Sequence, residues 1–191
     1  RSRGLGDVYK RQHHLWFTDK DYIKLGSKIK WNPAIKSKND RDALWEAVKE
    51  DKIDISASDH APHTIDEKDK EYPISPSGMP GVQTLVPVML NHVNNKKLSL
   101  NRFVQLTSAN PARLFGIKRK GFLELGNDAD FTIIDLNKER TIENNWIASK
   151  CGWTPYDGMK IKGWPIMTVI RGNIVMSCLL YTSPSPRDRL L

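Results

Sequence analysis

Cysteine is scarce in this sequence. The 191 residues include two cysteines, Cys151 and Cys178, and Cys178 lies in a C-terminal stretch that we interpret below as foreign. Without it, Cys151 has no partner for an internal disulfide. This composition fits a protein of a reducing compartment, and it gives no support to a small secreted domain held together by disulfides.

Long apolar runs and basic clusters are also missing. No apolar run approaches the roughly 20 residues that a helix needs to cross a membrane. The formal net charge is +8, but the lysines are spread along the chain, whereas a nucleic-acid-binding surface needs a basic patch or stripe. We therefore expect neither a membrane nor a nucleic acid as a partner.

Both ends of the chain are expected to be foreign. Residues 2–12 can be encoded by one strand of a DNA oligonucleotide whose opposite strand, shifted by a base, encodes residues 178–188. This oligonucleotide resembles a common sequencing-library adapter. We set aside residues 1–12 and 178–191 as adapter-derived and expect them to pack on nothing. They carry six basic and two acidic residues, so the net charge without them falls from +8 to +4.

The most informative stretch runs from Ile53 to Thr64 and reads IDISASDHAPHT. Its first residues alternate between apolar and polar, as in a β-strand, and Asp59, His60 and His63 follow. Titratable side chains directly after a strand are typical of the catalytic end of a barrel. A carboxylate there can bind a metal and carry a proton, and a neutral imidazole can bind a metal or hydrogen-bond a substrate. A loop of solvated polar residues is the alternative interpretation.

The motifs that follow point to a known family. The chain continues with Asp66-Glu67-Lys68 and then PSGMPGVQTL at residues 76–85. Together with DHAPHT, these segments resemble the dihydroorotases, metal-dependent cyclic amidases of the amidohydrolase superfamily. Further matches occur in the expected order: HHL at 13–15, NP at 32–33, TSANPAR at 107–113, SK at 149–150 and WTPYDG at 153–158. The resemblance spans residues 13–175.

The resemblance implies an α/β fold. Residues 13–120 would form the C-terminal part of a TIM-type (β/α)8 barrel, and residues 121–177 would add a docking loop and strands of the small β-sandwich domain that flanks such barrels. A complete barrel needs roughly 200 to 250 residues, so we expect residues 13–177 to be a fragment of the fold.

Hydrophobic spacing and turn residues add detail to this expectation. A helix is predicted from Asn39 or Asp40 to about Lys52, strands at 121–136 on both sides of a turn at 126–128, and a hairpin at 167–176. The side chains predicted to pack in the interior are Phe103, Leu114, Phe115, Trp153, Tyr156 and Trp164, whereas His92 is predicted to be solvated.

The resemblance also implies a metal site. His14 and Asp59 would bind Zn²⁺, which the family usually holds as a binuclear centre. Asp59 would in addition be catalytic, because it would take a proton from the attacking water and deliver it to the leaving nitrogen. From the residues alone, His14 can equally be read as a surface histidine near a chain end.

Four more residues would contact the substrate by resemblance. Asn32 and His63 would hold the substrate, and Ser77 and Gly78 would bind it through their backbone. The sequence itself leaves simpler interpretations open, since Asn-Pro and Ser-Gly pairs are both common in turns.

The implied reaction is the reversible hydrolysis of the cyclic amide of (S)-dihydroorotate to N-carbamoyl-L-aspartate in pyrimidine biosynthesis. The family acts on this small molecule in the cytoplasm and is expected to be homo-oligomeric. The chain lacks the metal ligands that the family places in its first half, so the fragment alone is expected to be inactive. Alternatives are another cyclic amidase, such as an allantoinase or dihydropyrimidinase, an inactive structural homologue, and a metal- or partner-binding module that no positive feature supports.

Overall fold

The computed structural model describes residues 9–177 and 180–181. These residues form two compact units. The first comprises the described residues up to Leu85 together with Thr141–Lys160, and the second comprises Val86–Arg140 and the described residues from Ile161 onward. Among all the residues that the structure describes, no helix has both the length and the apolar character required to cross a membrane.

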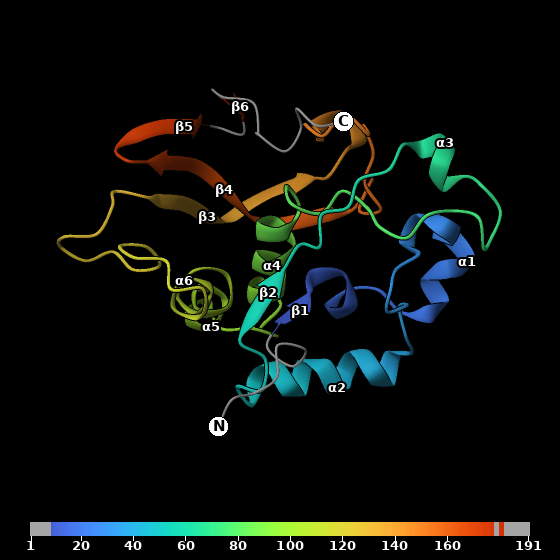
Figure 1. The fold of residues 1–191 in the computed structure, drawn as a ribbon, viewed down its shortest axis with the longest axis horizontal. Helices are drawn as coiled ribbons and strands as arrows, with labels where there is room; N and C mark the ends of the chain where they lie inside the picture. The colour runs from blue at the N-terminus through green and yellow to red at the C-terminus, as the bar shows by residue number, and fades with distance from the viewer. Residues whose placement is uncertain (1–8, 178–179, 182–191) are drawn as a thin grey trace. The chain divides into compact units, whose positions relative to one another are not determined.

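The first unit contains two short parallel strands and three helices (Figure 1). Tyr9 pairs with Ile55 and Arg11 with Ala57, in parallel register. The elements are β1 (Tyr9–Arg11), α1 (Tyr22–Leu25), α2 (Lys38–Lys49), β2 (Ile55–Ala57) and α3 (Ile65–Lys68), with 3₁₀ turns at Gln12–Leu15, Asp19–Asp21, Gly26–Ile29 and Asn144–Trp146.

Helix α2 begins earlier than its sequence predicts. Ser37 is the N-cap residue, because its hydroxyl accepts a hydrogen bond from the Asp40 backbone N–H while the Asp40 carboxylate bonds back to Ser37. Asp40 is therefore the third residue of a capping box and not the cap. The helix buries Trp45 and Val48, and the Trp45 indole donates to the carbonyl of Leu15 at 3.1 Å. This contact fixes α2 on the turn that carries the two neighbouring histidines.

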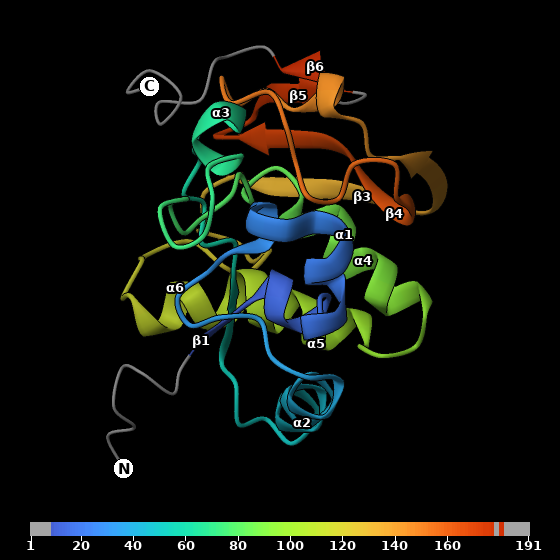
Figure 2. The same ribbon diagram turned by 90° about the vertical axis from the view of Figure 1, so that its right-hand side faces the viewer.

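The second unit consists of a four-stranded sheet, in the order β3-β4-β5-β6, and a helical segment. Figure 1 and Figure 2 both show the helices on one side of this sheet. The elements are α4 (Leu85–Asn94), α5 (Leu100–Val104), α6 (Asn110–Leu114), β3 (Phe131–Thr141), β4 (Lys160–Ile170), β5 (Asn173–Ser177) and β6 (Leu180–Tyr181), with a π-helical turn at Gln105–Ala109 that joins α5 to α6.

Polar side chains of α4 attach it to the sheet. The amide of Asn94 donates to the carbonyls of Leu136 and Lys162, at 3.1 and 2.9 Å. Gly163 allows the close approach, since a Cβ there would lie 2.8 Å from the Cβ of Leu90. The backbone φ of Gly163 is also +99°, which favours glycine.

The predicted hairpin near the C-terminus is confirmed. Met167 pairs with Ser177, and Ile170 with Asn173, in antiparallel register. The two turn residues, Arg171 and Gly172, both have positive φ, as a two-residue turn that matches the strand twist requires.

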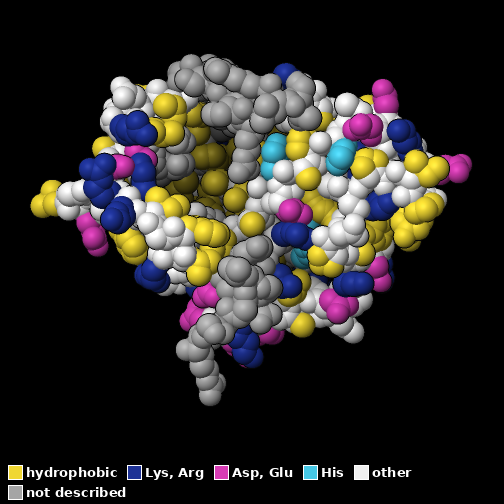
Figure 3. Space-filling model, in the orientation of Figure 1, with side chains coloured by type: hydrophobic (Ala, Val, Ile, Leu, Met, Phe, Trp, Pro, Cys, Tyr) yellow, Lys and Arg dark blue, Asp and Glu magenta, His cyan; other side chains and the backbone are white. Residues whose placement is uncertain are grey.

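Other predictions for the second unit were wrong or only partly right. Of the two strands predicted at 121–136, the first is absent, because residues 121–130 contain turns and bends but no strand, whereas the second is present as β3 and begins at Phe131. Leu114 and Phe115 are 44% and 62% exposed, although Phe103 is buried as predicted. His92 is buried, because α4 is covered around most of its circumference and not along the apolar stripe alone. The turn region between α6 and β3 exposes apolar side chains among charged ones (Figure 3), and Leu125 is fully exposed there.

Residues that we expected to be foreign take part in both sheets. Tyr9–Arg11 supplies β1, and Leu180–Tyr181 supplies β6, which pairs with β5 through Met176 and Ser177. The side chain of Gln12 is buried and donates to the carbonyl of Gly81 at 2.9 Å. The expectation that these ends would pack on nothing is thus incorrect at these positions, since an extended backbone can pair whatever its side chains. Residues 1–8, 178–179 and 182–191 lie outside the described part of the chain.

Candidate functional site

Asp59 follows the end of β2 by two residues, in the position after a strand that the sequence predicts. Its backbone has a φ of +49°, in the left-handed region that few residues other than glycine occupy. Aspartate tolerates this region better than most residues do, and such conformations collect at functional sites. The turn directs the chain away from the strand at the position where a catalytic group is expected.

Arg11 at the end of β1 is the cation that Asp59 contacts. The Arg11 Nε lies 2.9 Å from the Asp59 Oδ2, and both side chains are partly exposed. The same guanidinium donates to the backbone carbonyl of Asn32 at 2.6 Å. The parallel pairing of β1 and β2 places these two strand ends side by side. Two of the predicted site residues therefore meet through an arginine that sequence reasoning had set aside.

His14 lies in the same neighbourhood. Its Nε2 is 3.0 Å from the carbonyl oxygen of Pro33, and because a carbonyl can only accept, Nε2 carries the proton in this contact. The lone pair of the neutral ring is then on Nδ1. Burial lowers the pKa of His14, the bond to Pro33 and the charge of Asp59 raise it, and Arg11 lowers it further. The net shift is downward, which favours the neutral ring that metal binding requires.

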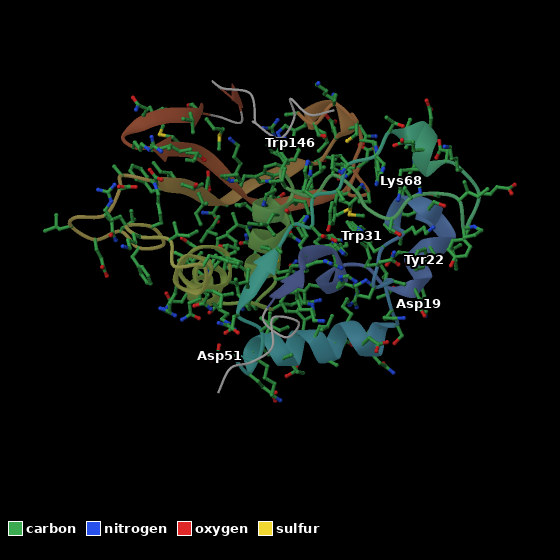
Figure 4. All side chains as sticks on the ribbon, in the orientation of Figure 1. Asp19, Tyr22, Trp31, Asp51, Lys68 and Trp146 are labelled. Carbon is green, nitrogen blue, oxygen red and sulfur yellow. The ribbon has the colours of Figure 1, made fainter. Side chains whose placement is uncertain are left out.

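His13 has a structural role by its surroundings. It is buried, and its ring packs at a tilt of 41° against Trp31, which Figure 4 labels, with 3.4 Å between the ring centroids. Neither ring nitrogen has a hydrogen-bond partner among the described residues. Burial, followed by the charges of His14 and Arg11, lowers the pKa of His13 far below its usual range, so the ring is neutral at every physiological pH.

A second group of predicted residues is built around His63 and Gly78. The carbonyl of His63 accepts a hydrogen bond from the Trp153 indole at 2.7 Å, and its ring Nδ1 lies 3.4 Å from a carboxylate oxygen of Glu67. Gly78 has a φ of +130°, and a Cβ at this position would lie 2.6 Å from the carbonyl oxygen of Ala61. A glycine is thus required where this loop meets the DHAPHT segment.

His60 supports this loop. Its Nδ1 accepts from the backbone N–H of Gly81 at 3.1 Å and lies 3.3 Å from the backbone nitrogen of Val82. The residue also forms an isolated parallel bridge with Met79. The sequence assigned no role to His60, and the structure gives it the role of joining the segment after β2 to the Pro-Gly-rich loop.

The described residues do not form a complete zinc site. Among them, no three His, Cys, Asp or Glu side chains are grouped so that they could hold a metal ion. Protein zinc sites use three or four such ligands, whereas His14 and Asp59 offer two, and the Asp59 carboxylate is already paired with Arg11. The arrangement can bind and orient small polar groups and can hold a proton on Asp59 or His14, but it does not by itself hold a metal.

Sequence reasoning missed Arg11, Lys30 and Lys68. Arg11 lay in an end regarded as foreign, Lys30 was given no role, and Lys68 was noted only as part of the Asp66-Glu67-Lys68 motif. Lys68 is in fact fully buried. The roles predicted for His14, Asn32, Asp59, His63, Ser77 and Gly78 stay predictions.

Comparison with known proteins gives consistent matches over most of the chain. The model of the amidohydrolase family matches residues 6–175. The chain is 45% identical to the dihydroorotase of Pyrococcus furiosus over 164 residues, and this alignment covers 86% of the chain and 38% of the relative. It is 47% identical to the dihydroorotase of Pyrococcus abyssi over 164 residues, with 86% and 39% covered. The chain thus spans about two fifths of the length of these relatives.

Solved structures of hydantoinases share the fold. The L-hydantoinase (dihydropyrimidinase) from Arthrobacter aurescens matches with a TM-score of 0.89 and 32% identity, over 92% of this chain and 40% of that one. A D-hydantoinase structure matches with a TM-score of 0.84 and 28% identity over the same shares. The fold is therefore α/β and of the TIM-barrel type, and how much of the barrel the chain contains stays a prediction.

Proposed function

The chain belongs to the amidohydrolase family, and from this premise we propose that it is part of a dihydroorotase. The observation that carries the proposal is the 45% and 47% identity to two dihydroorotases over 164 residues. The reaction would be the reversible hydrolysis of dihydroorotate to N-carbamoyl-aspartate, carried out by the intact protein as a cytoplasmic homo-oligomer. The geometry around Asp59 supports this proposal, because its carboxylate is linked through Arg11 to the backbone of Asn32 and its charge acts on His14.

In the proposed reaction, water adds to the ring carbonyl carbon and the carbon–nitrogen bond of the cyclic amide breaks. Asp59 would accept the proton of the attacking water and pass it to the departing nitrogen. His63 and Asn32 would hold the substrate, and the backbone of Ser77 and Gly78 would bind it. Zinc in the intact enzyme would polarise the carbonyl and acidify the water, with His14 and Asp59 among its ligands.

A hydantoinase-type or dihydropyrimidinase-type activity is the second candidate. The likeness to hydantoinase structures favours it, although at 32% and 28% identity. Both candidates cleave a cyclic amide, so they differ in the ring that the site accepts and not in the chemistry.

The test is complementation of a split enzyme. The chain would be produced together with the part of the Pyrococcus furiosus dihydroorotase that it does not cover, with zinc supplied. We expect turnover of dihydroorotate by the pair, a loss of at least about a hundredfold in an Asp59→Asn variant, and no turnover by the chain alone. Turnover of dihydrouracil or hydantoin in place of dihydroorotate would favour the second candidate. An Asp59→Asn pair as active as the parent pair would contradict the role of Asp59.

A further inference from the structure

The loop from Pro73 to Gly78 is held by two lysines that no assigned role explains. Lys30 donates through Nζ to the carbonyls of Pro73 and Ser75, at 2.8 and 2.5 Å. Its own backbone carbonyl accepts the N–H of Gly78 at 3.0 Å. Lys30 thus bonds to both ends of the loop: its side chain bonds to Pro73 and Ser75, and its backbone carbonyl bonds to Gly78.

Lys68, the last residue of α3, also forms hydrogen bonds to this loop. Its side chain, labelled in Figure 4, is fully buried, and its Nζ donates to the carbonyl of Pro76 at 2.7 Å. Its backbone carbonyl accepts from the hydroxyl of Ser75 at 3.1 Å. Both lysines therefore use a side chain and a backbone group on one short segment.

The burial of Lys68 close to a second positive charge is electrostatically unfavourable. Burial and the positive charge of Lys30 lower the pKa of Lys68 to about 8. Lysine is seldom fully buried, because removing an ammonium from water is costly. Both lysine ammonium groups nevertheless donate hydrogen bonds to carbonyl groups of the same loop. The backbone of this loop therefore has more hydrogen bonds to charged donors than an ordinary surface turn.

The residue in the middle of the held segment is left free. Among the described residues, Ser77 forms no hydrogen bond with the rest of the protein, although Pro76 and Gly78 on either side are both bonded. Gly78 lies against Ala61, and a Cβ on it would lie 3.4 Å from the ring of His63. The N–H, carbonyl and hydroxyl of Ser77 are therefore available to a ligand beside the DHAPHT segment, on a backbone fixed by its neighbours.

We propose that Lys30 and Lys68 are positioning residues, which hold the loop Pro73–Gly78 so that the polar groups of Ser77 and Gly78 are presented to the substrate. The identity of that substrate, a cyclic amide with hydrogen-bonding ring atoms, rests on the proposed function. The holding of the loop does not, because it follows from contacts within the first unit.

The test is amide hydrogen exchange at Gly78 in the full 191-residue chain, measured by NMR. Lys30→Met removes two hydrogen bonds from a charged donor, so we expect exchange at Gly78 to become about tenfold faster or more. The ring signals of His63 should shift with it, because Gly78 lies beside that ring. Lys30→Arg restores a charged donor and should return both readouts most of the way toward the parent values.

Two further variants separate positioning from general stability. Lys70→Met removes an exposed lysine of the same region and should change exchange at Gly78 by less than about twofold. Ser75→Ala removes one bond to Lys68 and should speed exchange in the loop. It should leave unchanged the backbone amide of Glu50, which donates to the carbonyl of Glu46 at the end of α2 and reports on the integrity of that helix. Equal exchange in Lys30→Met and Lys70→Met, or a uniform rise across α2 and the loop, would overturn the positioning role whatever the enzyme's substrate.

Discussion

Arg11 sets the charge around the carboxylate of Asp59, because its guanidinium pairs with the group that we propose to bind metal and carry a proton. In the chain produced together with the missing part of the Pyrococcus furiosus dihydroorotase, we expect Arg11→Gln to strengthen binding of Co²⁺, a spectroscopic substitute for zinc, by about tenfold, since it removes a cation about 3 Å from the proposed ligand Asp59. The measurement is a titration followed by visible absorbance.

The matched control is Lys49→Gln, which removes the same charge from an exposed pair with Glu46. It should leave the Co²⁺ affinity unchanged. If Arg11→Gln and Lys49→Gln behave alike, Arg11 does not compete with a metal for Asp59.

Lys68 makes the stability of the chain depend on pH. Its pKa is about 8 when folded and 10.5 for an unburied lysine, so between these values the unfolded state binds more protons. The free energy of unfolding therefore rises with pH in this window, by up to about 3 kcal/mol in full. Urea unfolding at about pH 7 to 9.5 should show this rise in the parent chain and lose it in Lys68→Met. An unchanged slope in the variant would mean that another group is responsible.

At the scale of elements, the loop that carries Ser77 depends on a glycine. In Gly78→Ala the new Cβ would meet the Ala61 carbonyl at 2.6 Å, at a φ of +130°. We expect a loss of about 2 to 4 kcal/mol in the free energy of unfolding. Gly152→Ala is the control, since Gly152 also has a positive φ but nothing within 4 Å of an added Cβ, and it should cost about 1 kcal/mol. Equal losses in urea unfolding would show that the close contact is relieved at no cost.

Elements with local signals were predictable from sequence. The hairpin at 167–176 was predicted because Arg171-Gly172 is a turn signal between two apolar runs, and β2 because Ile53 and Ile55 alternate with polar residues. The segment 121–130 carries similar apolar residues but no strand. Whether such a segment pairs depends on a neighbouring strand with free backbone groups, which the local pattern does not contain.

The sequence predicted where along the chain the candidate site residue Asp59 lies, but not which side chains it contacts. The strand end at Asp59 followed from the alternation before it, whereas its pairing with Arg11 depends on a strand from a distant part of the chain. Lys68 shows the same limit. In the sequence it belongs to a charged run that suggests solvent, and its burial results from the loop that folds over it.

At the scale of the whole molecule, exposed apolar side chains should govern behaviour in solution. Leu123 and Leu125 are 78% and 106% exposed, and such surface favours association. We expect sedimentation velocity to show concentration-dependent association of the chain, reduced in a Leu123→Glu/Leu125→Glu variant. Ile23→Glu, at a comparably exposed position of the first unit, is the comparison and should reduce association less. A chain that sediments as a monomer at all concentrations would contradict this expectation.

The pairing of β1 with β2 has a consequence for the design of chimaeric proteins. Its ladder is formed by main-chain atoms, from Tyr9 opposite Ile55 to Arg11 opposite Ala57, and main-chain atoms are nearly the same in every sequence. If two sequences are joined within such a strand, the strand can therefore still form. The residue at its end, however, then comes from the foreign sequence, and its side chain can differ from the one that the site requires. The junctions of a chimaeric protein with this fold should therefore be chosen so that the side chains at the strand ends are kept. That the strand still forms is not a sufficient criterion.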